Sequence, residues 1–147
     1  MFAQLDTKSV YSFMDSVVDL TTYVERAKEL GYQALGLMDR DNLYAAYHFA
    51  QLASRNGLRP LIGMEANLFY EGRKIPFRLL AKNNQGYKNL MKLATELSSG
   101  QREFTAFSDY LNAIALILPS EDWEPGMTLG SEVFIGVRPE DAGKEFD

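Results

Sequence analysis

The sequence predicts an α/β fold, in which parallel strands alternate with helices to form a layer or a barrel. Over the first 65 residues, short apolar runs and amphipathic stretches alternate in the order strand, helix, strand, helix, strand. Glycines stand where the two helices should end. The connections are short, which favours parallel strands joined by right-handed crossovers.

The first elements can be placed from local signals. Residues 2–14 fit a strand, a turn and a second short extended piece. Apolar residues then recur at helical spacing from 20 to 30, with Asp19 before them as an N-cap and Gly31 after them as a C-terminal glycine. The apolar run 34–38 is typical of a strand that is buried on both faces.

A second helix and a third strand follow. The helix is expected over 43–55 and ends before Gly57, and the strand is expected over 60–64. After residue 65 the pattern changes to a hairpin, a third helix and two more strands. These are expected at 66–70 and 75–81 around a turn at 71–73, then at 85–99, 113–118 and 133–137. The polar stretch 139–147 is expected to fray.

Composition narrows the class of protein. A chain of 147 residues that is 46% hydrophobic suits one globular domain. Its net charge of -5 disfavours binding of nucleic acid by the whole surface, because phosphates repel an acidic body. The absence of cysteine excludes disulfides and thiolate metal sites. Without a secretion signal or an apolar run of about 18–20 residues, we expect a cytoplasmic protein with no membrane partner.

Basic residues are concentrated in one stretch that contains no acidic residue. They are Arg73, Lys74, Arg78, Lys82, Lys88 and Lys92. This stretch could form a patch for an acidic partner or for a nucleic-acid backbone. The more ordinary interpretation is that these side chains lie on the solvated faces of the hairpin and the third helix.

Charged residues also follow the predicted parallel strands, and functional side chains gather at such strand ends in α/β folds. These positions carry Asp6, Lys8, Asp39, Arg40, Asp41 and Glu65. Asp6, Asp39 and Glu65 could hold magnesium or manganese through oxygen ligands. Lys8 and Arg40 would offset these carboxylates and compete with a cation, so the alternative is a network of ion pairs that closes the mouth of the barrel.

The single histidine, His48, lies within the second predicted helix. Its spacing to Tyr44 and Leu52 predicts an interior or flanking position. Zinc sites usually need several imidazoles or thiolates, so we interpret His48 as structural and predict no catalytic residue.

Three ordered blocks carry the most specific signal. They read FAQLDTKSVYSFMDS, YVERAKELGYQALGLMDRDNLYAAYHFAQLASRNGLRPLIGMEANL and RLLAKNNQGYKNLMKLATELS. Together they resemble the PHP domain that begins the alpha subunit of bacterial DNA polymerase III. The resemblance is clear over 2–99 and looser over 108–137. It implies that residues 1–147 are the N-terminal part of a PHP domain, with a partial TIM-like barrel of parallel strands and a hairpin after the third strand.

The resemblance also implies that a metal site has been lost. The family's His-x-His pair reads Asp6-Thr7-Lys8 here, and the histidine of its Thr-Asp-His motif is Arg40. The degenerate metal-site positions are therefore Asp6, Lys8, Asp39, Arg40, Glu65 and Pro76. The expected consequence is no cofactor, with manganese or magnesium as the alternative.

The implied function is a non-catalytic structural or docking segment of the replicative polymerase, and the parent subunit would be a DNA-directed DNA polymerase. The alternative is a metal-dependent phosphoesterase or 3'-5' exonuclease of the PHP family. Implied partners are the rest of the alpha subunit, other replisome subunits or a proofreading exonuclease, with DNA reached only through the parent protein. The open strand edges of a partial barrel also allow self-association.

Overall fold

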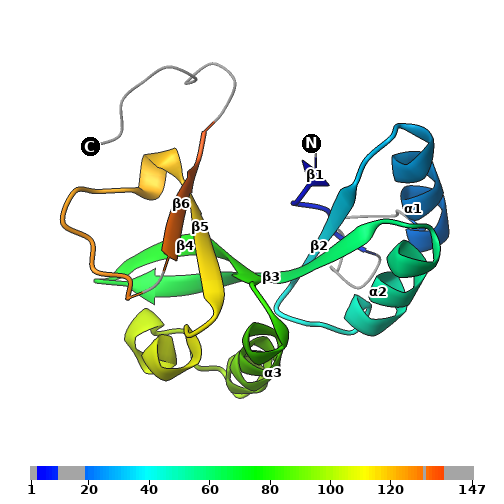
Figure 1. Cartoon of the computed structure of the whole chain (residues 1–147). Helices are drawn as coiled ribbons and strands as arrows, with labels where there is room; N and C mark the ends of the chain where they lie inside the picture. Colours follow the sequence, from blue (N-terminus) through cyan, green and yellow to red (C-terminus); the bar gives the residue numbers. More distant parts are fainter. Residues whose placement is uncertain (1–2, 10–18, 131, 138–147) are drawn as a thin grey trace.

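The fold is a curled sheet covered by helices (Figure 1), seen in a computed structural model that describes residues 3–9, 19–130 and 132–137. The strands are β1 (Ala3–Gln4), β2 (Ala34–Arg40), β3 (Arg59–Tyr70), β4 (Arg73–Ala81), β5 (Ile114–Pro119) and β6 (Glu132–Gly136). The helices are α1 (Leu20–Glu29), α2 (Ala46–Arg55) and α3 (Asn84–Ser98), with short 3-10 segments η1 (Phe104–Tyr110) and η2 (Ser120–Asp122). The polar stretch 139–147 and residues 10–14 of the first predicted segment lie outside the described residues.

The strands lie in the sheet in their order along the chain, from β1 to β6. The pairs β1–β2, β2–β3 and β5–β6 are parallel, and the pairs β3–β4 and β4–β5 are antiparallel. The sheet curls into half of a barrel with β1 and β6 at its open edges (Figure 1). The predicted α/β class, partial barrel and hairpin are confirmed.

Helix ends follow the predicted local chemistry. The Asp19 carboxylate accepts a hydrogen bond of 3.0 Å from the Thr22 amide, so it caps α1. Gly31 follows α1 with a φ of 76° and Gly57 follows α2 with a φ of 75°. A residue with a Cβ is strained in this left-handed conformation, which explains why both helices end at glycine.

The prediction of two separate strands at 60–64 and 66–70 is wrong, because β3 is one strand of 12 residues. It pairs with β2 over Arg59–Glu65 and with β4 over Gly63–Tyr70. The strand continues because it gains the second partner before it leaves the first. Glu71 and Gly72 then make a two-residue turn with φ values of 49° and 79°.

The buried face of α2 also differs from the predicted one. Tyr44 is 79% exposed and Tyr47 is 71% exposed. Of the two positions predicted for His48, interior or flanking, the interior one is wrong because its side chain is exposed. The helix instead buries Phe49 among alanines. Small side chains let a helix approach a sheet closely. The prediction missed this alanine-rich face because it followed the helical spacing of the tyrosines instead.

Two hydrophobic cores stabilise the described part of the chain. One lies between α3, η1 and the antiparallel strands, where the rings of Phe77 and Phe104 stack with centroids 4.9 Å apart. The other joins α1 and α2 to β2, where Tyr23 stacks on Phe49 at 6.2 Å. Each core includes side chains from a different end of β3.

Among the described residues, no helix combines the length and the apolar character that a bilayer crossing requires.

The Tyr23 hydroxyl, which donates a hydrogen bond of 3.0 Å to the Gly36 carbonyl, gives a testable pH dependence. Burial raises the pKa of Tyr23 to about 12 from 10.0. Because the folded pKa lies above the unfolded one, its contribution to stability is complete below pH 10.0 and is lost as the pH rises to about 12. Denaturation between these pH values should therefore show a smaller pH dependence in Tyr23→Phe than in the wild type.

Candidate functional site

The charged residues predicted at the strand ends converge at the carboxyl end of β2. Arg40, the last residue of β2, pairs with Glu65 in the parallel register with β3. Asp6 and Lys8 lie in the segment that follows β1, beside the same end of β2. Four of the predicted residues therefore occupy one place, although they come from three separate parts of the chain.

Their side chains form a continuous set of ion pairs. The Lys8 Nζ lies 3.0 Å from Asp6 Oδ1 and 3.1 Å from Glu65 Oε2. The Arg40 guanidinium approaches the other Glu65 oxygen, with its Nη2 at 3.0 Å and its Nε at 3.2 Å. The Arg78 Nε lies 2.7 Å from Asp6 Oδ2 and 3.7 Å from Glu65 Oε2. We call these five residues the ion-pair cluster.

The centre of the cluster is shielded from solvent although Arg40 at its rim is exposed, and the charges of the cluster are unequal. The Glu65 side chain is only 6% exposed and that of Lys8 is 16% exposed. Two carboxylates face three cations, so the cluster carries one net positive charge. A buried charge is costly unless it is paired, and these contacts provide the pairing.

The Asp39 carboxylate holds the segment after β1. Asp39 is 2% exposed, and its two oxygens accept hydrogen bonds of 2.6 Å each from the Ser9 amide and the Ser9 hydroxyl. Sequence reasoning had no signal for Ser9, because the contact joins residues that are 30 positions apart. Asp39 therefore tethers the segment that carries Asp6 and Lys8.

Arg78 is the cluster member that the sequence interpretation assigned elsewhere, to the basic stretch. Its place follows from the hairpin, because Tyr70 pairs with Arg73 and each further pair leads back to Glu65 opposite Arg78. A two-residue turn at Glu71–Gly72 fixes this register, and the missed signal was the length of the turn, which was predicted over 71–73. Pro76, the other predicted position on β4, pairs with Asn67 and lies on the same face as Arg78.

The other predicted basic residues do not join Arg78. At the start of β4, Arg73 lies 3.4 Å from Glu124, and beyond its end Lys82 lies 2.6 Å from Glu132. The nine residues of β4 separate these two positions by roughly 30 Å. Three exposed lysines complete the stretch, namely Lys74, Lys88 and Lys92. The six basic residues thus do not form one surface.

A second ion pair lies beside the cluster. Asp41 has a φ of 58° and its amide donates a hydrogen bond of 2.9 Å to the Glu65 carbonyl. Its carboxylate accepts two hydrogen bonds from the Arg102 guanidinium, at 2.9 and 2.8 Å. These hydrogen bonds raise the pKa of Arg102 above its usual range. The pair links the end of β2 to the segment before η1.

A double-mutant cycle can measure this link. Asp41→Asn and Arg102→Gln should show a coupling free energy of about 1 kcal/mol, because the pair is bidentate but both side chains are about one-third exposed. Asparagine is the appropriate replacement because it tolerates a positive φ. Urea denaturation of the wild type, both single variants and the double variant gives the coupling. If the losses of unfolding free energy in the single variants added up to the loss in the double variant, the pair would make no net contribution to stability.

The donor set does not fit a metal centre. Within residues 3–9, 19–130 and 132–137, no three histidine, cysteine, aspartate or glutamate side chains are grouped so as to hold a metal ion. Asp6 and Glu65 are bound by Lys8 and Arg78, which a divalent cation would have to displace against its own repulsion. Asp39 is bound by Ser9.

The curled sheet with charged residues at its strand ends defines a class of α/β half-barrels. It is similar to a proposed metal-dependent phosphoesterase from Bifidobacterium adolescentis, with a TM-score of 0.53, 18% identity and coverage of 64% of this chain and 32% of the other. It is also similar to an amidohydrolase from Chromobacterium violaceum, with a TM-score of 0.54, 20% identity and coverage of 67% and 34%. At these identities the likeness shows the fold.

The chain belongs to the PHP domain family, whose pattern matches residues 4–124. It is 47% identical over 137 residues to the DNA polymerase III subunit alpha of Streptococcus pyogenes serotype M1, covering 93% of this chain and 13% of the relative. It is 33% identical over 126 residues to the corresponding subunit of Bacillus subtilis strain 168, covering 82% of this chain and 11% of the relative. The predicted resemblance to these subunits is confirmed, and the chain spans about 13% of the length of such relatives.

Proposed function

We propose that the chain is a non-catalytic structural and docking segment of a DNA polymerase III alpha subunit that acts in DNA replication. The observation that carries the proposal is the position of Lys8 and Arg78, which bind both carboxylates of the cluster. Positive charge that metal ions would supply in a catalytic PHP site comes here from the protein's own side chains.

The cluster supports a structural role because of the elements it joins. Asp6 and Lys8 belong to the segment after β1, Arg40 to β2, Glu65 to β3 and Arg78 to β4. The ion pairs therefore connect the parallel half of the sheet to the hairpin. Because three cations share two carboxylates, loss of either carboxylate would leave partly buried positive charge unpaired.

The alternative function is a metal-dependent phosphoesterase or 3'-5' exonuclease that uses Asp6, Asp39 and Glu65 with manganese or magnesium. The phosphoesterase proposed for the Bifidobacterium protein gives this alternative a precedent within the fold. The contacts of Asp39 with Ser9 and of Glu65 with Lys8 weigh against it, since these oxygens are the ones that a metal would need.

The proposal places the segment in the cytoplasm, within a subunit that is a DNA-directed DNA polymerase. Its partners would be the rest of that subunit and other replisome proteins, including a proofreading exonuclease, and DNA would be reached through the parent protein. The edges at β1 and β6 give the separate chain a route to self-association.

Metal titration tests the non-catalytic role. Isothermal titration calorimetry with Mn²⁺ and Zn²⁺ should detect no saturable site. In the presence of Mn²⁺, the wild type and Glu65→Gln should hydrolyse bis(p-nitrophenyl) phosphate at the same background rate. One tight equivalent of metal, together with hydrolysis abolished by Glu65→Gln, would establish the phosphoesterase alternative. Lys8→Met should reveal a latent site if Lys8 alone blocks one.

A further inference from the structure

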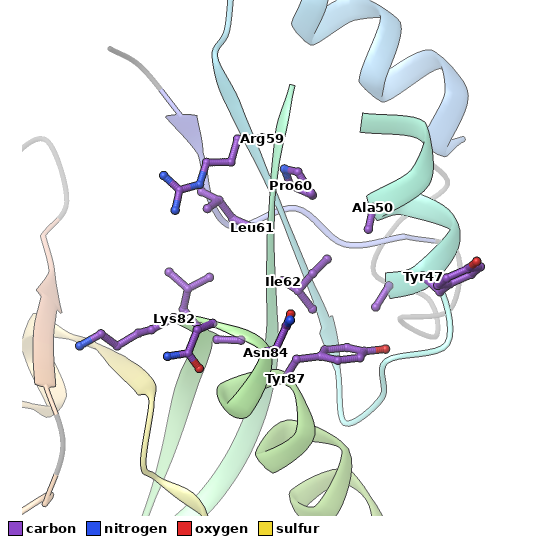
Figure 2. A pocket seen from close by; sticks show the side chains of 13 residues that line it. Tyr47, Ala50, Arg59, Pro60, Leu61, Ile62, Lys82, Asn84 and Tyr87 are labelled. Atoms are coloured by element: carbon purple, nitrogen blue, oxygen red, sulfur yellow. The ribbon is translucent and has the colours of Figure 1, made fainter. Parts of the chain in front are cut away.

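A groove of about 520 Å³ lies between α2 and α3, away from the ion-pair cluster. It is formed where β3 begins and β4 ends, whereas the cluster lies at the other end of the β2–β3 pairing. Figure 2 shows the side chains that line it, with Tyr87 extending from α3 toward α2. The two sites are therefore separate surfaces of the half-barrel.

The floor of the groove is apolar. Pro60, Leu61 and Ile62 from β3 meet Leu80 and alanines from neighbouring elements. Isolated apolar side chains are common on protein surfaces, but a concave group of them marks a binding site.

Exposed large side chains extend this surface along α3. A second hollow of about 300 Å³ shares Tyr87 with the groove and includes Tyr44 and Met91. Tyr44 is 79% exposed, Tyr47 is 71% exposed and Met91 is 42% exposed. Tyrosine and methionine are enriched in protein–protein interfaces, and two hollows that adjoin at Tyr87 suit a peptide segment better than a compact ligand.

The groove also differs from the rest of the chain in charge. Its lining contains Arg59 and Lys82 and no acidic residue, whereas the chain as a whole has a net charge of -5. Lys82 pairs with Glu132 at 2.6 Å, and Arg59 has no ion pair with any described residue. Figure 2 shows Arg59 and Lys82 pointing to the side opposite Tyr47, so the cations lie at one end and the tyrosine at the other.

We propose that the α2–α3 groove binds a short amphipathic segment of a partner protein, with apolar side chains on the floor and carboxylates at the end that holds Arg59 and Lys82. This inference rests on the docking role proposed above and specifies the surface and the chemistry of its partner. Charge complementarity favours an acidic segment. Nucleic acid fits less well, because a phosphate backbone is bound by many cations whereas this lining has two, and because the floor is aliphatic rather than aromatic.

Fluorescence anisotropy with designed probes tests this proposal. The first probe is a helical peptide with leucines at i, i+3, i+4 and i+7 and two terminal glutamates, and the second has glutamines in place of the glutamates. The third probe has lysines there, and the fourth is a ten-nucleotide oligo(dT). We expect the acidic peptide to bind at least about 10-fold more tightly than the glutamine peptide, a difference of about 1.4 kcal/mol. The lysine peptide should bind most weakly of the three.

Two variants locate the binding on the groove. Tyr47→Ala and Arg59→Glu should each weaken the acidic peptide about 10-fold or more, and both alter exposed side chains, so the fold should persist. Arg55→Glu is the matched control, because Arg55 is an exposed arginine of α2 outside the lining. No saturable binding, equal binding of the three peptides, or equal loss with Arg55→Glu would overturn the proposal. Tighter binding of oligo(dT) than of the acidic peptide would reassign the groove to nucleic acid.

The outcome is independent of the test of the non-catalytic role. If the protein showed metal-dependent hydrolysis that Glu65→Gln abolishes, the non-catalytic role would be overturned, but the measured peptide affinity could still support the groove. Loss of peptide binding would overturn the groove assignment and leave the ion-pair cluster as a structural element.

Discussion

Replacement of Glu65 by glutamine is expected to lower the free energy of unfolding by about 3–5 kcal/mol, the range for breaking one partner of a buried ion pair. Glu65 is 6% exposed and contacts Lys8 and Arg40 within 3.1 Å. Glutamine keeps the shape but removes the charge, so Lys8 and Arg78 would keep only the carboxylate of Asp6 and Arg40 would lose its charged partner Glu65. Urea denaturation followed by circular dichroism at neutral pH measures the loss.

A matched control separates burial from charge. Glu29 also pairs with an arginine, at 2.9 Å from Arg26, but its side chain is 66% exposed. Glu29→Gln should therefore cost less than about 1 kcal/mol. Adding Lys8→Met to Glu65→Gln should recover part of the loss, because it removes one of the unpaired cations. Equal losses for Glu65→Gln and Glu29→Gln would contradict a structural role for the cluster.

Gly36→Ala is expected to release the β1 segment from the sheet and to lower stability by about 3 kcal/mol, at the upper end of the range for overpacking. A Cβ at Gly36 would collide with the Leu5 carbonyl oxygen and lie 2.7 Å from the Leu5 Cα and 2.9 Å from the Gln4 carbonyl oxygen. These are backbone atoms, so relief requires movement of the segment that carries Asp6 and Lys8. Relative to the wild type, hydrogen exchange of the variant should become faster in residues 3–9 and should change less in α3.

Gly136→Ala provides the corresponding control in another strand. A Cβ there would lie 3.6 Å from the Leu118 carbonyl oxygen, which is an ordinary contact. We expect a change of less than about 0.5 kcal/mol, as for substitutions without a specific mechanism. If Gly36→Ala proved equally mild, β1 would not depend on this close approach.

Much of the fold could be predicted from local signals in the sequence. Asp19 and Gly31 define the ends of α1 through their own chemistry, and the turn at Glu71–Gly72 identifies the hairpin. These features succeed because each depends on residues within a few positions of one another. The sequence prediction divided β3 into two strands, because the continuity of β3 comes from its second partner strand rather than from its own composition.

The candidate site was only partly predictable. Strand ends bring Asp6, Lys8, Arg40 and Glu65 together, as the α/β pattern implies. Arg78 required the register of the hairpin, and the contact of Ser9 with Asp39 required the path of the chain after β1. The α2–α3 groove could not be seen in the sequence, because the spacing of Tyr44 and Tyr47 favoured a buried face whereas both side chains are exposed.

The change of partner along β3 has a consequence for how the molecule unfolds. Its pairing with β2 ends at Glu65 and its pairing with β4 begins at Gly63, so within β3 only Gly63, Met64 and Glu65 pair with strands on both sides. The two hydrophobic cores lie on either side of this short overlap. Cooperativity between them is carried by these three residues, by the ion-pair cluster and by the Asp41–Arg102 pair. We therefore expect the half-barrel to unfold as two units, and we expect their coupling to weaken when these contacts are removed.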